Sequence, residues 1–377
     1  MRIGIDGYPL AEARTGVGHY TLELARALAL LSPSDQFELV SPAPFEHAAL
    51  DELERANLPN LRTANPRASS IRGHWWSIGL PLYARRASFD LFHGTNFELP
   101  LWKRRRSVVT IHDLSTLLHP EKHLSRQVRR ARLRLPLVAR IANMIITPTE
   151  SVKREVCLHL GVRPEKVTAI PLAARNGFRP MPFAETAAIR RRLGIEDDFL
   201  LFVGTLEPRK NALTLLRAFE KIIGHSSFRP QLVIAGGEGW LMDELLAFTR
   251  KATIRARLRL TGYLSDGDLR ALYSSCRVFI YPSVYEGFGL PPLEAPACGA
   301  PVIGGRIASL QETLGGAARL VEPLDVDALA KEILDLLQNE DQRQLLSAAG
   351  PQQASKFSWE QTARLTLEVY RRVIAAP

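Results

Sequence analysis

The sequence contains few cysteines and no long apolar run. Its three cysteines, Cys157, Cys276 and Cys298, lie far apart, without the spacing of a metal-ligand set or a redox pair. We interpret them as reduced thiols of a cytosolic protein. No apolar run approaches the roughly 18 to 20 residues that span a bilayer. The first ten residues indicate a strand, not a basic and then apolar leader.

Two common nucleotide-binding motifs are also missing. Gly16 and Gly18 begin a G-x-G-x-x-G pattern, but Thr21 occupies the position of its third glycine. No G-x-x-x-x-G-K-[ST] sequence occurs anywhere in the chain. NAD binding and a Walker-type ATPase are therefore disfavoured. A glycine turn before a helix can still bring backbone N–H groups close to a phosphate, or it can be a turn without a ligand.

Basic charge is abundant in one segment. The chain has a net charge of +10, and residues 103–140 hold 11 basic residues against 2 acidic ones. Such a patch favours a polyanionic partner, either a membrane or a nucleic acid. Nucleic acid is the less favoured partner, because no stacking aromatic residues interleave with the arginines.

Within this segment, residues 122–140 have the pattern of an amphipathic helix that Pro136 could kink or split. Apolar residues recur at 124, 128, 131, 135, 138 and 142, which is a helical spacing. The basic residues at 103–106 and on the helix predict a surface for anionic lipid; the helical ones are Arg126, Arg129, Arg130 and Arg134. The alternative is a solvated helix whose apolar face lies in the core.

Alternating β-rich and helical patterns predict two doubly wound α/β domains, separated by an irregular linker over 171–198. Strands are expected near 1–6, 36–40, 61–64, 89–92, 107–111, 143–147, 167–170, 199–203, 231–235, 257–261, 277–281 and 300–303. Helices are expected near 17–31, 46–54, 72–87, 122–140, 149–160, 210–224, 239–251, 265–275, 289–298, 306–313, 325–338, 340–350 and 358–375. Ligands of such sheets bind at the carboxyl ends of the strands.

Two short polar segments follow predicted strands. In "VVTIHDLS", His112 and Asp113 could contact a substrate or could merely cap the next helix. In "LFVGTLEPRKN", Arg209 and Lys210 stand at a helix start, where two cations oppose the helix dipole unless an anion joins them. A diphosphate would supply that anion. A solvated basic turn is the alternative.

The segment "SVYEGFGLPPLEAPACG" places Glu286 and Glu294 around a glycine loop at another helix start. A carboxylate accepts hydrogen bonds from vicinal hydroxyls such as those of a ribose or hexose. A glycosidase pair is not excluded by the spacing. The neighbouring anion-binding features are unexplained by hydrolysis, however, and favour transfer from an activated donor. The alternatives are a first-turn acid for Glu294 and a solvated loop acid for Glu286.

The stretch "YEGFGLPPLEA" resembles the E-x(7)-E signature of family 4 retaining glycosyltransferases. "TGVGHYTLEL" resembles the glycine-rich N-terminal loop and helix of the family, and "LTGYLSDGDLRALY" resembles its segment that holds the nucleotide base. Four blocks resemble those of the bacterial branch that builds surface polysaccharides: "DLFHGTNFELP", "VVTIHDLS", "ITPTESVKREV" and "LFVGTLEPRKN". The resemblance implies a GT-B fold, α/β with two Rossmann-like domains facing across a cleft. Residues 1–170 would form an acceptor-binding domain and residues 171–357 a nucleotide-sugar domain. The final helix, 358–377, would pack back on the first.

The resemblance also implies roles for individual residues. Glu294 would bind the donor ribose, Glu286 the hydroxyls of the donor sugar, and Lys210 the diphosphate. The family arginine is replaced by Thr205, and we expect Arg209 to take over its role. His112 would touch the donor sugar, and Asp113 would belong to the acceptor side. The remaining predicted donor-binding residues are Gly16, Val17, Gly204, Thr205, Tyr263, Leu264, Gly287, Phe288, Gly289 and Leu290.

The expected chemistry is a transfer with retention that needs no cofactor and no metal. "DGD" at 266–268 and "DVD" at 325–327 look like metal motifs but are better interpreted as helix N-caps. GDP-mannose is the favoured donor and a UDP-hexose the next. The expected partners are a glycan or polyprenyl-linked acceptor and the anionic inner leaflet, which predicts a cytoplasmic protein peripheral to the inner membrane. A nucleotide-sugar epimerase and a non-catalytic binding module are the alternatives.

Overall fold

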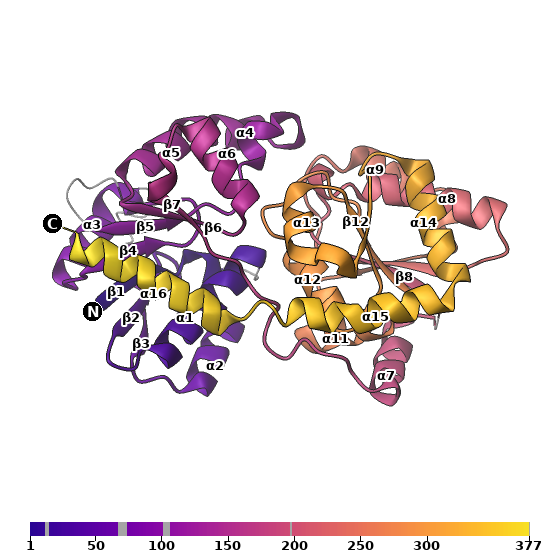
Figure 1. The fold of residues 1–377 in the computed structure, drawn as a ribbon, viewed down its shortest axis with the longest axis horizontal. Helices are drawn as coiled ribbons and strands as arrows, with labels where there is room; N and C mark the ends of the chain where they lie inside the picture. Colours follow the sequence, from indigo (N-terminus) through magenta and orange to yellow (C-terminus); the bar gives the residue numbers. More distant parts are fainter. Residues whose placement is uncertain (12–14, 67–73, 101–105, 197, 377) are drawn as a thin grey trace. The chain divides into compact units, whose positions relative to one another are not determined.

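A computed structural model describes residues 1–11, 15–66, 74–100, 106–196 and 198–376. The chain divides into two units (Figure 1). The first comprises Met1–Leu117, Arg129–Ala173 and Phe357–Pro377, and the second comprises Leu118–Val128 and Ala174–Lys356. Each unit is built around its own parallel sheet.

The first unit contains, among its described residues, a seven-stranded parallel sheet in the order β3-β2-β1-β4-β5-β6-β7. Its strands are β1 (Arg2–Asp6), β2 (Gln36–Val40), β3 (Leu61–Ala64), β4 (Leu91–Gly94), β5 (Ser107–Thr110), β6 (Met144–Thr147) and β7 (Val167–Ala169). The helices of this part of the chain are α1 (Gly16–Leu31), α2 (His47–Ala56), α3 (Leu80–Arg86), α4 (Ser115–Leu118), α5 (Ser125–Ile141) and α6 (Glu150–Leu160). The strand order reverses between β1 and β4.

The second unit has, among its described residues, a six-stranded parallel sheet in the order β10-β9-β8-β11-β12-β13. Its strands are β8 (Phe199–Val203), β9 (Gln231–Ala235), β10 (Leu258–Gly262), β11 (Val278–Tyr281), β12 (Val302–Gly305) and β13 (Arg319–Val321). Its helices are α7 (Phe183–Leu193), α8 (Ala212–His225), α9 (Asp243–Thr249), α10 (Ala252–Arg255), α11 (Asp266–Ser275), α12 (Leu290–Ala297), α13 (Ala308–Leu314), α14 (Val326–Gln338) and α15 (Glu340–Ala354). Here the order reverses between β8 and β11.

Continuous apolar runs explain the central strands. β8 reads Phe-Leu-Leu-Phe-Val and β11 reads Val-Phe-Ile-Tyr, and both are buried along their whole length. Strands of this kind are typical of parallel sheets that helices cover on both faces. The predicted α/β class with two doubly wound sheets is confirmed.

Several helices begin with a side-chain cap, which satisfies an otherwise unpaired amide of the first turn. The side chain of Asp325 accepts from the Ala328 amide, so the "DVD" segment is an N-cap as predicted. For the "DGD" segment the prediction was wrong in detail. Ser265 supplies the cap of α11, and Asp266 already lies in the first helical turn.

Several elements differ from the predictions, and the short helices α4 and α10 were not predicted. The expected linker at 171–198 contains α7, whose sequence FAETAAIRRRL is rich in helix formers. The three-residue strand β13 escaped prediction because it is too short to give a pattern. The helix expected at 72–87 has a π-helical first part, Trp75–Gly79, before α3, and its residues 72–73 lie outside the described ones. Pro136 lies inside α5, which continues through it.

The last helix, α16 (Trp359–Ala375), belongs to the first unit and packs against α1. The Tyr370 hydroxyl lies 2.7 Å from Nδ1 of the buried His93 on β4. Thr362 donates a hydrogen bond to the Pro171 carbonyl at 2.7 Å. Residues 118–128, which the sequence placed in a first domain of residues 1–170, group with the second unit. No helix among the described residues combines the length and the apolar character needed to cross a bilayer.

Candidate active site

The best-formed candidate site of the second unit lies where the strand order reverses. The loops after β8 and β11 meet there, and ligands of open α/β sheets bind at such a point. Glycine is required beside it: Gly236 has φ +143°, and a Cβ on it would lie 2.1 Å from the Gly204 carbonyl oxygen. The "GTLEPRK" segment after β8 and the "SVYEGFG" segment after β11 thus lie together at this point of the sheet.

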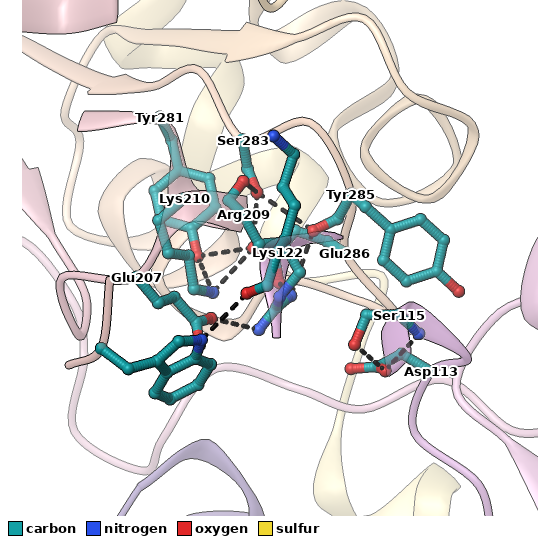
Figure 2. A network of polar contacts seen from close by, with 11 residues as sticks. Asp113, Ser115, Lys122, Glu207, Arg209, Lys210, Tyr281, Ser283, Tyr285 and Glu286 are labelled. Carbon is teal, nitrogen blue, oxygen red and sulfur yellow. Dashed lines mark hydrogen bonds and ion pairs between the residues drawn. The ribbon is translucent and has the colours of Figure 1, made fainter. Parts of the chain in front are cut away.

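Glu286 is the centre of a polar network at this point (Figure 2). Its Oε1 accepts hydrogen bonds from Lys210 Nζ at 2.7 Å, Ser283 Oγ at 2.8 Å and Tyr281 Oη at 3.0 Å. Its Oε2 accepts from Arg209 Nη1 at 3.0 Å. The carboxylate is only 7% exposed. The structure thus brings together three residues that the sequence proposed, and it excludes the alternative of a solvated loop acid.

The charges of this network are balanced. Burial favours a raised pKa for Glu286, but Arg209 and Lys210 outweigh it and lower the pKa to about 2. Arg209 also donates to Glu207 Oε1 at 2.6 Å and to the Tyr285 carbonyl at 3.0 Å. Two cations therefore face two carboxylates. At neutral pH Glu286 is an ionised hydrogen-bond acceptor and has no proton to give.

Glu294 has a different partner. It lies in α12, is 1% exposed, and receives Nε of Arg175 on Oε1 at 2.6 Å and Nη2 on Oε2 at 2.9 Å. Nη1 of Arg175 donates to Asp266 at 2.6 Å. Glu294 is the fifth residue of α12, beyond its first turn, so the first-turn-acid alternative is wrong and a bidentate ion pair fixes the carboxylate instead.

The glycine loop between the two glutamates leads into α12. Gly289 is the N-cap residue with φ +84°, a conformation that favours glycine. Pro291 and Pro292 occupy the first turn, where proline is tolerated but has no N–H to donate. Amide donors at this helix start are therefore restricted to residues 287–290, the four that the sequence proposed: Gly287, Phe288, Gly289 and Leu290.

The other predicted donor-binding residues of this unit also follow strands. Gly204 and Thr205 come directly after β8, and Tyr263 and Leu264 come directly after β10. Tyr263 is 59% exposed, whereas Leu264 packs against the core. All four therefore lie at the carboxyl-end edge of the sheet.

In the first unit, His112 comes two residues after β5. Its Nε2 lies 2.8 Å from the Thr95 carbonyl oxygen, and its ring meets Tyr20 and Phe97 edge-on. Burial lowers the pKa of His112, so the ring is neutral at pH 7. A carbonyl can only accept, so Nε2 carries the proton and Nδ1 is an acceptor. At a substrate hydroxyl, Nδ1 of His112 would therefore accept a hydrogen bond.

Asp113 takes the helix-capping alternative. Its Oδ1 accepts hydrogen bonds from the amide and the hydroxyl of Ser115, at 2.9 and 2.7 Å, at the start of α4. Gly16 and Val17 form the first turn of α1, behind the extended N-cap residue Thr15. Residues 12–14 of that loop lie outside the described residues.

The four arginines of α5 that the sequence proposed for a membrane surface fall into two sets. Arg130 and Arg134 form ion pairs with Glu98, the former at 2.7 Å. Arg126 and Arg129 are exposed. The predicted apolar face packs into the core through Val128, Leu135 and Val138. The exposed side of the helix carries Leu133 and Leu137 at 71% and 39% exposure. Residues 103–105 of the predicted basic surface lie outside the described residues.

Metal-ligand and disulfide chemistry find no support in the part of the chain that the structure describes. There, no three His, Cys, Asp or Glu side chains gather as a metal ion would need. All three cysteines are free thiols.

Solved structures share this two-unit architecture. The chain is similar to sucrose-phosphate synthase from Thermosynechococcus elongatus, with a TM-score of 0.78, 23% identity and 100% of both chains covered. It is also similar to Anabaena HepE in complex with UDP-glucose, with a TM-score of 0.76, 18% identity and 98% and 99% covered. The fold is the predicted GT-B glycosyltransferase fold.

The sequence comparisons identify the family. Residues 185–353 match the model of glycosyl transferases group 1, and residues 14–174 match that of glycosyltransferase family 4. O-antigen chain mannosyltransferase B of Escherichia coli is 31% identical, over 98% of this chain and 100% of its own length. The mannosyltransferase WbdA of Escherichia coli is 31% identical over 72% of this chain, which is 34% of that longer protein. The chain belongs to the family 4 glycosyltransferases and is a glycosyltransferase.

Sequence reasoning missed several residues of the site: Arg175, Glu207, Tyr281 and Ser283. Glu207 and Ser283 flank the proposed residues, so a search of the same two loops for further polar side chains would have found them. Arg175 lies in an irregular segment without periodicity, and no pattern there marks it.

Proposed function

We propose that the enzyme transfers a hexose from a nucleotide-diphosphate sugar to a glycan or a polyprenyl-linked acceptor in surface-polysaccharide synthesis. The observation that carries this proposal is the convergence of Arg209 and Lys210 on the buried, ionised Glu286 at the switch point of the second sheet. Mannose is the favoured sugar, because the full-length relative is an O-antigen mannosyltransferase. GDP-mannose is accordingly the favoured donor.

Arg209 and Lys210 suit the stabilisation of a departing diphosphate. In the transfer, the bond between the anomeric carbon and the phosphate oxygen breaks, and the acceptor oxygen bonds to the same face of the sugar. Negative charge then grows on the diphosphate, and nearby cations and amides that are already oriented lower the energy of that state. The acceptor proton passes to a phosphate oxygen of the donor, so no protein base is required. The two cations make a metal ion unnecessary in this scheme.

The acceptor groups suit the sugar hydroxyls. Glu286 stays ionised at neutral pH and can accept from the transferred hexose. In the first unit, Nδ1 of His112 is an acceptor that suits a substrate hydroxyl. Glu294 is assigned to the ribose of the donor.

A donor panel tests the proposal. The enzyme is incubated in EDTA with GDP-mannose, UDP-glucose, UDP-galactose or ADP-glucose and with a polyprenyl-linked glycan acceptor, and the product is analysed by mass spectrometry and NMR. We expect transfer of mannose from GDP-mannose with the anomeric configuration of the donor. Transfer from a UDP-hexose would reassign the donor. An inverted product, or activity only with added divalent metal, would contradict the mechanism.

We further propose that the exposed side of α5 binds the anionic cytoplasmic surface of the inner membrane. Its exposed leucines, Leu133 and Leu137, lie on the same helix as the exposed Arg126 and Arg129, which combines apolar insertion with cationic attraction. Each basic residue near such a surface is worth about 1 kcal/mol.

Vesicle co-sedimentation tests this membrane surface. The variant Arg126→Glu/Arg129→Glu should lose binding to vesicles that contain anionic lipid, whereas Arg191→Glu/Arg192→Glu on α7 serves as the matched control. Equal binding of both variants, or equal binding of the native protein to neutral vesicles, would remove the electrostatic proposal.

A further inference from the structure

Arg175 is a loop residue whose side chain is buried and extensively hydrogen-bonded. It lies between β7 and α7, within the second unit, and its side chain is only 8% exposed. All three guanidinium nitrogens donate: Nε and Nη2 to Glu294, and Nη1 to Asp266. Burial alone would lower the pKa of Arg175, but Glu294 outweighs it and raises the pKa above its ordinary value.

The orientation of the guanidinium is fixed from several sides. Its central carbon lies 4.3 Å from the centroid of the Phe178 ring, which packs edge-on against the fully buried Tyr273. Asp266 holds the remaining nitrogen at the start of α11. A planar group that is stacked on one face and bonded at three nitrogens has a single orientation.

This orientation determines what Glu294 can still bind. A carboxylate offers about four lone pairs, two on each oxygen. Arg175 occupies one on each oxygen, so one acceptor position is left on Oε1 and one on Oε2, in a plane that Arg175 defines. The guanidinium takes the two lone pairs that point in the same direction, so the remaining two point to opposite sides of the carboxylate. Each of them can accept from one hydroxyl, such as the 2′ hydroxyl of a ribose.

We propose that Arg175 is a positioning residue that sets the plane of Glu294 for the 2′ hydroxyl of a ribose and thereby makes the enzyme select ribonucleotides over deoxyribonucleotides. The proposal rests on the proposed function, in which Glu294 faces the ribose of the donor. Arg175 itself touches no substrate in this scheme and acts through Glu294.

The test measures the preference of the enzyme for a ribonucleotide over its 2′-deoxy form. A merely structural role of Arg175 would leave this preference unchanged. Binding of GDP and of 2′-deoxy-GDP is measured by calorimetry for the native enzyme and for Arg175→Met and Arg175→Lys, with UDP and 2′-deoxy-UDP as a second pair. One hydrogen bond to a charged acceptor is worth roughly a tenfold to hundredfold change in affinity. We expect the native enzyme to show that preference for the ribonucleotide, and Arg175→Met to bind both forms within about threefold of each other.

Arg175→Lys keeps the positive charge but cannot fix a plane, so it should also lose most of the preference. If Arg175→Met does not fold, Arg175→Lys alone provides the test. Arg343→Met is the matched control, because Arg343 is an equally buried arginine of the same unit that bonds to Glu340 and to carbonyls of α14. It should melt at a lower temperature and keep the native preference.

The possible results distinguish a failure of the proposed function from a failure of the role of Arg175. A native enzyme that binds neither GDP nor UDP would overturn the proposed function and the role of Arg175 with it. A native preference that survives in the Arg175 variants would overturn the role of Arg175 alone. A preference lost equally in Arg343→Met would assign the effect to general destabilisation and would also overturn it.

Discussion

Glu286 is a buried carboxylate whose cost of burial is offset by specific partners. Removing an ion from water costs several kcal/mol, which is recovered only when the geometry is good and the lone pairs are satisfied. Lys210, Arg209 and two hydroxyls meet that condition. In the proposed function, an arriving diphosphate would compete with Glu286 for the same two cations. The network therefore holds Arg209 and Lys210 in place before the donor binds.

The role of Lys210 is tested by Lys210→Ala. We expect kcat to fall about 10² to 10³-fold, because one preorganised contact to the leaving group is lost. Lys221→Ala is the control, since Lys221 forms an exposed ion pair with Asp327 in the same unit. Steady-state kinetics and melting curves measure both variants. Turnover within about twofold of the native value in a folded Lys210→Ala would remove this role.

Asp6 gives a prediction for pH. Burial raises the pKa of Asp6 to about 7, although the Tyr8 amide opposes the shift. Because the pKa is higher in the folded than in the unfolded state, the associated stability is complete below pH 3.8 and is lost as the pH rises to about 7. Asp6→Asn should therefore stabilise the protein at pH 8. We expect a higher melting temperature and a gain of at most about 4 kcal/mol in the free energy of unfolding.

This gain should shrink towards pH 4, whereas the exposed Asp51→Asn should show no such trend. Thermal melts of the three proteins between pH 4 and pH 8 measure it. A constant difference between Asp6→Asn and the native protein would contradict the raised pKa.

Sequence reasoning could propose residues but not their partners. Glu286, Arg209 and Lys210 stand in loops at strand ends, where the parallel-sheet rule directs attention. Arg175 and Glu294 are separated by 119 positions, and their pairing depends on how an irregular segment packs against α12. No local pattern encodes such a contact.

At the scale of elements, α16 completes the core of the first unit. A buried chain of hydrogen bonds runs from Tyr370 on α16 to His93, on to Thr110, and from Thr110 to Tyr20 on α1. Burial lowers the pKa of His93 to about 3, so the ring stays neutral. This chain of hydrogen bonds connects the helices α1 and α16 to the strands β4 and β5.

Tyr370→Phe tests this link. It leaves a buried ring nitrogen of His93 without its partner, which should cost about 1 to 3 kcal/mol of unfolding free energy. Tyr8→Phe, at a tyrosine that is 42% exposed, should cost much less. Chemical denaturation gives both values. Equal costs would show that the hydrogen-bond chain contributes nothing beyond burial of the ring.

Most elements could be predicted because buried parallel strands read as apolar runs and the helices between them as amphipathic patterns. The failures have local reasons. α7 follows a stretch rich in proline and arginine. That composition predicted a linker, although the residues that follow it are good helix formers. β13 has three residues and depends on pairing with β12, so its extended form comes from the sheet.

At the scale of the whole molecule, two sheets of the same design carry different residues at corresponding places. The carboxyl-end edge of the second sheet holds the charged network, and that of the first holds the neutral His112. Two doubly wound domains followed from the sequence. The grouping of residues 118–128 with the second unit did not, since it depends on contacts such as that of Trp240 Nε1 with the Lys122 carbonyl, at 2.9 Å.

The central claim is that this glycosyltransferase binds a nucleotide-diphosphate sugar through Arg209 and Lys210 without a metal ion. Calorimetric titration of GDP-mannose into the native enzyme in EDTA tests it most directly, with Lys210→Ala alongside. We predict saturable one-to-one binding by the native enzyme and at least about tenfold weaker binding by the variant. Binding that appears only when Mg²⁺ or Mn²⁺ is added, or equal binding by both proteins, would contradict the claim.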